Sequence, residues 1–390
     1  MATRDSRTPL RVALLCHYPD DADAPAGGVW AVGRNLAAGL VSAGAQVHVI
    51  RYLPVGGSQD PAVRVTGRSP LFIHSIEIPR RSRLPLRRVA AVPLLQRELD
   101  AVRPDAITAH ESEYGLAALR SGYPAAVTIH GIPRQEFRSY SDWKRRLDLG
   151  LTIWQDWIMV RKARHIVAIN NYAMAQYRRR TRAQFHRIDV PIGDVFFDVP
   201  VRDPDPHALL MVGGMSERKD PLTLLRALSM LRLRVPGVRL RIAGRQPSGD
   251  FKIKVDRFIR DNGLEDSVQF IGSLNQPELA LAYTANAITV MSSRQETSPA
   301  VLMEAMAARR PVVASEVGGV AEIVAQGETG FTTSAGDAAS MALRLEELLN
   351  DPERAAAMGM RGREVAESRY RRGRVGEAYV RLLSHLAATW

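Results

Sequence analysis

The sequence predicts an α/β fold with two doubly wound domains, and three observations support this prediction. Short apolar runs alternate with helical patterns, which is typical of parallel sheets that helices cover on both faces. The alternation occurs twice, on either side of a stretch rich in proline and aspartate at 193–207. The length of 390 residues also exceeds what one hydrophobic core usually organises.

The first set of elements begins with an apolar strand at 11–16 and continues with a helix at 29–44, which Gly44 closes. A second strand follows at 46–50. Further strands of this half are expected at 105–110, 125–130 and 165–170. We therefore predict an N-terminal domain over residues 1–198.

The second set predicts a C-terminal domain over residues 199–371, in which helices such as 220–234 follow the strands. We expect the terminal helix, about 372–390, to rejoin the first domain. Ligands of doubly wound folds bind at the carboxyl ends of the strands, so the loops of both domains should face an interdomain cleft. The strands expected in this half are 208–213, 238–244, 267–272, 287–292 and 310–315.

The composition, with 46% hydrophobic and 24% charged residues, is that of a globular enzyme rather than a disordered or fibrous chain. The single cysteine, Cys16, excludes a disulfide framework and a cysteine-based metal site, and its apolar surroundings predict a buried core residue. No apolar run is long enough to span a membrane, and the first residues do not resemble a signal peptide. A cytoplasmic protein is the resulting expectation.

The net charge of +12 comes from 53 basic and 41 acidic residues, and it is concentrated in the first half. Residues 1–198 contain 28 basic and 18 acidic side chains (net +10), and the remainder contains 25 and 23 (net +2). Clusters at 80–88, 144–146 and 177–182 suggest solvated arginine faces, a surface for anionic lipids, or a nucleic-acid surface. No nucleic-acid-binding motif accompanies the charge, so we expect no nucleic acid and leave peripheral membrane contact open.

An apolar stripe at helical spacing follows one of these clusters. Its residues predict a helix face that packs against the core, with a membrane anchor as the alternative because arginines flank it. The residues of the stripe are Trp143, Leu147, Leu151, Trp154 and Ile158.

The segment 292–320 predicts a helix that begins at Pro299, because proline is favoured at the first helical position. Thr297 or Ser298 is the expected cap of this helix. The amides of Ala300 and Val301 then point outward at the positive end of the helix dipole, where anions bind.

Two glutamates flank the start of this helix. Glu296 lies in the preceding loop, where it is free to meet a ligand, and Glu304 lies about one turn inside the helix. Both could be ordinary solvent-exposed residues. However, the neighbours of Glu304 are mostly apolar, and a carboxylate in such a helix is unfavourable unless another group engages it.

The run ETSPAVLMEAMA (296–307), followed by VGGVAEIVAQGETGF, resembles the donor-site signature of retaining GT-B-type glycosyltransferases of family four. The resemblance extends from about residue 207 to 333 and implies two Rossmann-like domains that face a cleft. It also implies that Glu296 meets the donor sugar as a catalytic residue and that Glu304 holds the nucleotide ribose. The loop from Pro299 to Leu302 would lie along the diphosphate, with Ala300 and Val301 donating because proline has no amide hydrogen.

A second element of the resemblance is the loop VGGMSERKDP (212–221), in which Lys219 falls at the family's lysine position. Lys219 is therefore a candidate catalytic partner of the diphosphate, where it would stabilise the leaving group. The family's arginine is replaced by Gly214. Arg218, or Arg245 after Gly244, could substitute for it. Arg218 could equally be solvated, because adjacent side chains do not share a direction.

The N-terminal half shows the acceptor side of the resemblance. Gly27 and Gly28 lie in a glycine-rich loop before the first helix, where the backbone can approach a ligand closely. This loop is not a G-x-G-x-x-G fingerprint, which disfavours a nicotinamide dinucleotide site. His130 and His110 end two predicted strands and could orient the acceptor, with His130 at the family's catalytic His-Gly position. Glu111 is a candidate base.

These observations predict a retaining glycosyltransferase that moves a sugar from a nucleotide sugar to a sugar, lipid-linked or small-molecule acceptor. The N-terminal domain would bind the acceptor and the C-terminal domain the donor, whose base could be uracil, guanine or adenine. The alternatives are a GT-B-type nucleotide-sugar epimerase and a sugar-nucleotide-binding regulator. We expect no cofactor and no metal, because the Asp-x-Asp patterns at 21–23 and 203–205 fall in a polar loop and in the predicted linker.

Overall fold

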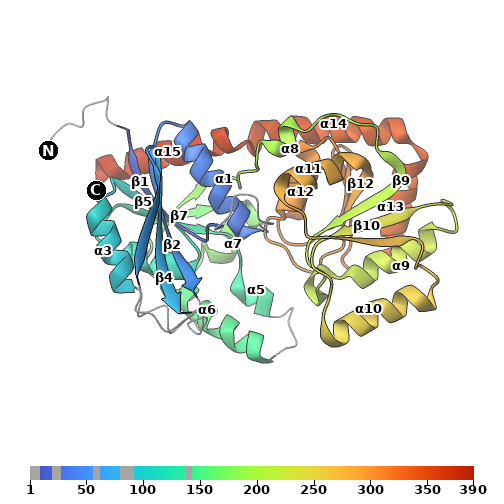
Figure 1. The fold of residues 1–390 in the computed structure, drawn as a ribbon, viewed down its shortest axis with the longest axis horizontal. Coiled ribbons are helices and arrows are strands. Elements are labelled where there is room, and N and C mark those ends of the chain that lie inside the picture. The colour runs from blue at the N-terminus through green and yellow to red at the C-terminus, as the bar shows by residue number, and fades with distance from the viewer. Residues whose placement is uncertain (1–8, 20–27, 56–61, 80–91, 138–142) are drawn as a thin grey trace. The chain divides into compact units, whose positions relative to one another are not determined.

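The computed structural model describes residues 9–19, 28–55, 62–79, 92–137 and 143–390, and the ribbon in Figure 1 shows their elements. The chain divides into two compact units. The first contains the described residues 9–19, Val29–Pro191 and Arg372–Trp390, and the second contains Ile192–Arg371 together with Gly28. The chain enters the second unit at Ile192, earlier than the sequence predicted.

The first unit contains an eight-stranded sheet with the order β3-β4-β2-β1-β5-β6-β7-β8. Neighbouring strands are parallel except for β3 and β4, which are antiparallel. Each predicted strand of this half is present, whereas β3, β4 and β8 were not predicted. The strands are β1 (Arg11–Leu15), β2 (Gln46–Val55), β3 (Val63–Arg68), β4 (Leu71–Pro79), β5 (Ala106–His110), β6 (Ala125–Ile129), β7 (His165–Ala168) and β8 (Gln184–Arg187).

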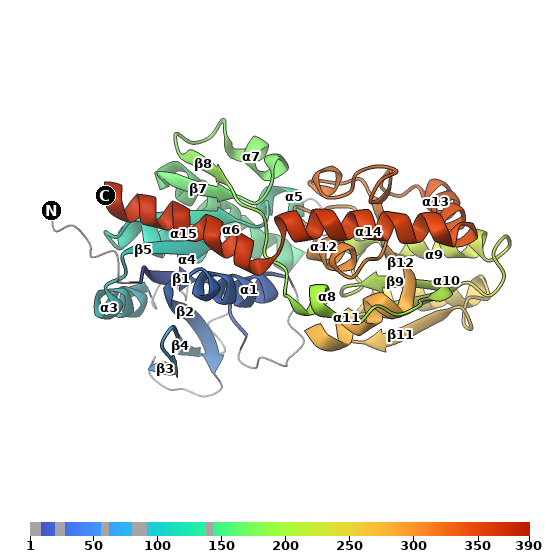
Figure 2. The ribbon, with the colours of Figure 1, turned by 90° about the horizontal axis from the view of Figure 1, so that it is seen from above.

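Helices cover both faces of this sheet (Figure 2). Two hydrophobic clusters form its core. The helices α1 and α15 contribute to one cluster, which includes the buried Cys16, and α3, α4 and α6 contribute to the other. The helices of the unit are α1 (Val29–Ser42), α3 (Val92–Val102), α4 (Ser112–Arg120), α5 (Pro133–Phe137), α6 (Trp143–Lys162), α7 (Asn171–Tyr177) and α15 (Arg372–Thr389).

Helices α1 and α15 approach each other closely because glycines lie where they cross. A Cβ on Gly39 would overlap the carbonyl oxygen of Arg372, and one on Gly376 would overlap that of Gly39. The C-terminal helix therefore belongs to the core of the first unit.

The second unit contains a parallel six-stranded sheet with the order β11-β10-β9-β12-β13-β14. The chain order reverses between β9 and β12, which makes the carboxyl ends of these two strands the topological switch point of the sheet. The strands are β9 (Asp205–Val212), β10 (Arg239–Ala243), β11 (Val268–Gly272), β12 (Asn286–Met291), β13 (Val312–Ser315) and β14 (Gly330–Thr333). The helices are α8 (Val195–Asp198), α9 (Pro221–Leu231), α10 (Gly249–Asp261), α11 (Gln276–Ala285), α12 (Ala300–Ala307), α13 (Ala338–Asn350) and α14 (Pro352–Arg369).

The stretch 193–207 is not the linker between the two domains that the sequence suggested, because it lies within the second unit. It contains α8, whose two phenylalanines are buried and which packs against α11 and α12, and it contains the start of β9. Asp205 in this stretch pairs with Arg239 at 2.8 Å and with Arg241 at 3.3 Å. The prolines and aspartates of this stretch suggested a linker, but the buried phenylalanines of α8 and the ion pairs of Asp205 hold it within the second unit.

The prediction that the apolar stripe of α6 faces the core was wrong. Leu147 and Trp154 are 59% and 58% exposed, and Leu151 and Ile158 are half-buried. The side chain of Trp143 lies outside the described residues. Helix α6 instead buries a face that contains Asp156, Met159 and Val160. Because this face includes an aspartate, the hydrophobic pattern could not identify it.

Candidate active site

Two loops meet at the switch point of the second sheet, one after β9 and one after β12. The hydroxyl of Ser292 donates to the carbonyl oxygens of Lys219 and Asp220, at 3.1 and 2.9 Å. Arg294 donates through Nε to the carboxylate of Asp220 at 2.9 Å and through its amide to the carbonyl of Arg218 at 2.8 Å. These bonds fix the two loops against each other and so position the side chains they carry.

Glu296 lies at the centre of this junction and is 7% exposed. Its Oε1 accepts hydrogen bonds from Lys219 Nζ at 2.6 Å and from Ser293 Oγ at 2.8 Å, and its Oε2 lies 3.2 Å from a terminal nitrogen of Arg218. Burial alone would raise the pKa of Glu296. The charges of Lys219 and Arg218 outweigh burial and lower it, so the carboxylate stays ionised at neutral pH.

Arg218 and Lys219 both contact Glu296, although they are adjacent in the chain. They lie in a short 3₁₀ turn, Glu217–Lys219, and the following residue, Asp220, is left-handed with φ 43°. Arg218 also donates to the carbonyl oxygen of Gln295 at 2.9 Å. The interpretation of Arg218 as a solvated loop residue is therefore wrong, because the extended-chain argument does not apply within a turn.

Glu304 lies on α12 and is also 7% exposed. Its Oε2 accepts a hydrogen bond from the hydroxyl of Tyr283 at 2.9 Å. Burial raises the pKa of Glu304 to about 7, and the bond from Tyr283 opposes this rise without cancelling it. This carboxyl group can therefore exchange a proton near neutral pH.

Helix α12 begins at Ala300, one residue later than predicted. Pro299 occupies the cap position itself, with no side-chain hydrogen bond, so the expected cap by Thr297 or Ser298 is not formed there. The amide of Leu302 already bonds to the carbonyl of Pro299 at 3.2 Å. The amides of Ala300 and Val301 precede this bond, and the first amides of a helix have no carbonyl partner inside it, so an anion at these two amides stays a prediction.

The glycines after β9 and β10 bring a third loop, the one after β10, into contact with the loop after β9. Gly244 has a φ of 145°, and a Cβ there would overlap the backbone of Gly213. The amide of Met215 donates to the carbonyl of Arg245 at 3.0 Å. A Cβ on Gly214 would lie 3.9 Å from the Cβ of Arg245, so the exposed Arg245 side chain starts beside the position where the family's arginine is missing.

In the first unit, the two predicted histidines contact each other. His110 Nδ1 and His130 Nε2 lie 2.6 Å apart, and the rings are stacked with centroids 4.8 Å apart. Burial lowers the pKa of His130 to about 4, and burial together with His130 lowers the pKa of His110 well below its usual value, so both rings are neutral at pH 7. His110 is 1% exposed and His130 is half-buried, so His130 is the one that can meet a ligand.

Glu111 follows directly after β5 and has a φ of 73°, a strained conformation for a residue with a side chain. Burial raises the pKa of Glu111 to about 7, and three neighbouring acids add to this effect: Glu113, Glu136 and Asp156. A base with this pKa could accept a proton at neutral pH. Gly28 precedes α1 with a φ of 51°, whereas Gly27 lies outside the described residues.

Within the described residues, no group of three or more His, Cys, Asp or Glu side chains could hold a metal ion. The Asp-x-Asp pattern at 21–23 lies outside these residues. In the other pattern, Asp205 is engaged by the two arginines described above.

Several site residues carried no signal in the sequence. Ser293 and Tyr283 each bind one of the two glutamates, and Ser292, Asp220 and Arg294 join the loops. Tyr283 comes from α11, which precedes β12, so only the folded chain brings it to α12.

Two sequence-family models match this chain. The model described as glycosyl transferases group 1 covers residues 194–365, and the one described as glycosyltransferase family 4 covers residues 26–190. A D-inositol 3-phosphate glycosyltransferase from Pseudarthrobacter chlorophenolicus is 27% identical over 383 residues, which span 90% of this chain and 89% of that protein. These matches name transferases and do not support an epimerase.

Solved structures show the same fold. Sucrose-phosphate synthase from Thermosynechococcus elongatus matches with a TM-score of 0.80 at 23% identity, over 98% of this chain and 100% of that one. Anabaena HepE in complex with UDP matches with a TM-score of 0.72 at 16% identity, over 96% and 100% of the two chains. The predicted fold class, GT-B with two Rossmann-like domains, is confirmed.

Proposed function

Because this chain belongs to glycosyltransferase family four and moves a sugar from a nucleotide sugar to an acceptor, we propose that its donor binds at the switch point of the second sheet. Transfer would proceed with retention of configuration at the anomeric carbon. The observation that supports this placement is the buried Glu296 with Lys219 and Arg218 against it, at the position where parallel sheets bind ligands.

In this proposal the charge that develops on the leaving diphosphate is stabilised without a metal ion or other cofactor. Lys219, Arg218 and the amides of Ala300 and Val301 are the donors available in the loops around Glu296. Glu296 remains ionised between the two cations and faces the donor sugar as the catalytic carboxylate.

Arg245 is the residue that we propose as the substitute for the family's missing arginine. It is exposed, and its Cβ lies next to position 214. Arg218 is already held by Glu296 and by the carbonyl of Gln295. Arg245 is therefore the cation that can turn toward a diphosphate without first leaving an ion pair with a described residue.

Glu304 is the proposed partner of the ribose hydroxyls. With a pKa of about 7 the free enzyme is a mixture of protonated and ionised Glu304. Hydroxyls that donate to a carboxylate favour its ionised form, so nucleotide binding should release a proton below pH 7.

We propose that the acceptor hydroxyl approaches His130 and Glu111 of the first unit. The neutral His130 ring can accept or donate a hydrogen bond, and Glu111 can accept the proton of the hydroxyl. The relative from P. chlorophenolicus is named for D-inositol 3-phosphate. A sugar, a lipid-linked molecule or another small molecule would fit this chemistry.

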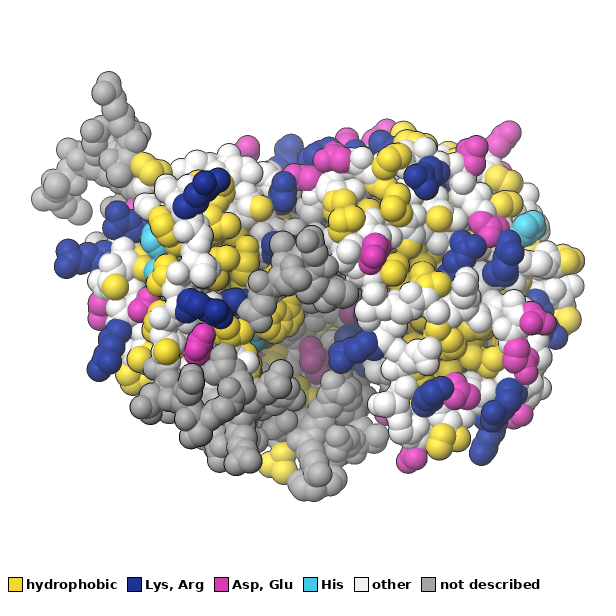
Figure 3. All heavy atoms as spheres, in the orientation of Figure 1, with side chains coloured by type: hydrophobic (Ala, Val, Ile, Leu, Met, Phe, Trp, Pro, Cys, Tyr) yellow, Lys and Arg dark blue, Asp and Glu magenta, His cyan; other side chains and the backbone are white. Residues whose placement is uncertain are grey.

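Peripheral contact with an anionic membrane is a further part of the proposal. No helix of the described residues is long and apolar enough to cross a bilayer. However, α6 exposes Leu147, Trp154 and Trp157 beside basic side chains, a combination that binds at membrane interfaces. On the face shown in Figure 3, Lys and Arg side chains are dispersed rather than gathered in one patch, so α6 is the better candidate. The protein should co-sediment with anionic vesicles, and the double variant Trp154→Ser, Trp157→Ser should remain in the supernatant. Equal co-sedimentation of the two proteins would contradict this contact.

The experiment for the donor site is thermal melting with UDP, GDP and ADP and their glucose conjugates. Binding to the native state alone raises the melting temperature, so one of these nucleotides should stabilise the enzyme. Glu304→Ala should reduce the shift. If none of the nucleotides shifts the melting temperature, the donor site proposed here is wrong.

A further inference from the structure

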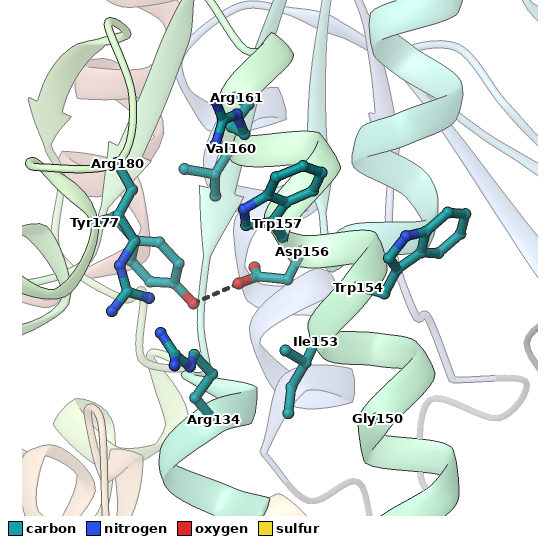
Figure 4. A pocket seen from close by; sticks show the side chains of 10 residues that line it. All are labelled: Arg134, Gly150, Ile153, Trp154, Asp156, Trp157, Val160, Arg161, Tyr177 and Arg180. Carbon is teal, nitrogen blue, oxygen red and sulfur yellow. Dashed lines mark hydrogen bonds between the residues drawn. The ribbon is translucent and has the colours of Figure 1, made fainter.

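A pocket of about 700 Å³ lies among α5, α6 and the end of α7 in the first unit (Figure 4). All residues that line it belong to this unit, so it is separate from the loops around Glu296. It is large enough for a small organic ligand.

Three arginines from three different segments line this pocket: Arg134 from α5, Arg161 from α6, and Arg180 after α7. None of them lies within 4 Å of a described carboxylate, although burial raises the pKa of Asp156 to about 6 and the charge of Arg180 acts against this rise. Figure 4 shows Arg134 and Arg180 extending toward each other beside the hydroxyl of Tyr177. Two like charges that face each other are unfavourable, and an anion between them relieves the repulsion and accepts hydrogen bonds from both forks.

Asp156 is the one acidic residue that lines the pocket. It is 6% exposed and accepts a hydrogen bond from the hydroxyl of Tyr177 at 2.9 Å. The three arginines contribute three positive charges and Asp156 one negative charge, so the net charge of the lining is +2. A phosphate monoester carries about −1.5 to −2 at neutral pH, so it matches this balance better than a carboxylate or a phosphodiester does.

The apolar part of the lining consists of two indole rings together with Ile153 and Val160. Trp154 and Trp157 are 58% and 52% exposed, and the guanidinium carbon of Arg161 lies 4.7 Å from the ring centroid of Trp157. Exposed aromatic faces beside a charged site suit a ligand that has an apolar or sugar-like body. The volume also exceeds what a phosphate group alone would fill.

We propose that this pocket binds a phosphate monoester, with the phosphate between Arg134 and Arg180 and the body of the molecule against Trp157. The same chemistry occurs in a soluble sugar phosphate and in the headgroup of a phosphatidic acid. This pocket is a second site, distinct from the proposed donor site, because binding there requires neither a nucleotide nor sugar transfer.

The test measures binding to the full-length protein by calorimetry with glucose 6-phosphate, and by sedimentation with phosphatidylcholine vesicles that contain or lack phosphatidic acid. Arg180→Ala should weaken binding about tenfold or more, since a hydrogen bond to a charged group is lost. Arg179→Ala is the matched control, because Arg179 is the exposed neighbour of Arg180 and does not line the pocket. Asp156→Asn should tighten binding, because it removes the opposing charge and keeps an acceptor for Tyr177.

Binding of glucose 6-phosphate that Arg180→Ala weakens identifies a soluble ligand. Binding of phosphatidic acid vesicles supports a lipid in the pocket only if Arg180→Ala weakens it, because anionic vesicles could also bind through the exposed face of α6. The proposal is overturned if neither probe binds, if glucose binds as well as its phosphate, or if Arg179→Ala weakens binding as much as Arg180→Ala. Weaker binding by Asp156→Asn also overturns the charge argument. Glu304→Ala should leave binding of the phosphate monoester unchanged. The test of this pocket can therefore succeed or fail independently of the test of the donor site.

Discussion

The loop after β12 and the helix α12 each bury one glutamate of the same short segment, yet the two carboxyl groups differ in protonation. Glu296 and Glu304 are equally exposed, at 7% each. The pKa of Glu296 is lowered by Lys219 and Arg218 against the effect of burial, and the pKa of Glu304 is raised by burial to about 7. Burial alone therefore does not determine the charge of a carboxylate. Cations within hydrogen-bonding distance decide it.

The largest effect that would test this comparison is expected from Lys219→Met, which keeps the length of the side chain and removes its charge. Glu296 would lose its shortest partner, and the diphosphate would lose a cation, so kcat should fall about 10²–10³-fold. Steady-state kinetics with the donor nucleotide found by melting would measure this. Lys252→Met is the control, because Lys252 pairs only with the nearby Asp256 on α10. A decrease no greater than that of the control would remove Lys219 from the reaction.

A smaller effect, on stability, is expected from Glu304→Gln. The folded pKa of about 7 lies above the ordinary value of 4.5, so ionisation of Glu304 destabilises the folded state as the pH rises from 4.5 through 7. The variant should therefore be more stable than the natural protein at about pH 8, by about 1–3 kcal/mol, and the difference should vanish near pH 4. Urea unfolding at several pH values would measure it. The exposed Glu265→Gln is the matched control, and a constant difference for Glu304→Gln would refute the raised pKa.

The smallest effect is expected from Tyr283→Phe, which removes one hydrogen bond to Glu304 and leaves the carboxyl group in place. The free energy of unfolding should fall by about 1 kcal/mol. The pKa of Glu304 should rise further, because the bond from Tyr283 lowers it. The pH at which nucleotide affinity is half-maximal should shift upward in calorimetric titrations, and a downward shift would be inconsistent with this role of Tyr283.

The sequence predicted the parallel sheets well because their buried strands are continuous apolar runs, as at 208–213 and 287–292. It missed β3, whose residues are mostly exposed. The contact of Glu296 with both Arg218 and Lys219 depends on the left-handed Asp220, and the contact of Glu304 with Tyr283 depends on the packing of two helices. Neither the left-handed backbone of Asp220 nor the packing of these helices produces a periodic pattern in the sequence. The orientation of α6 was predicted wrongly because its buried face contains an aspartate.

The place of α15 in the first unit has a consequence for the synthesis of the chain. Its residues Val375, Tyr379, Leu383 and Leu386 complete a hydrophobic cluster that also contains Val12 and Leu36. A ribosome synthesises these residues after the whole contiguous segment Ile192–Arg371 of the second unit. The order of folding should therefore reverse the usual N-to-C sequence, in which domains fold as they emerge. The second unit can complete its core before α15 is synthesised, and the first unit can do so only once α15 has emerged.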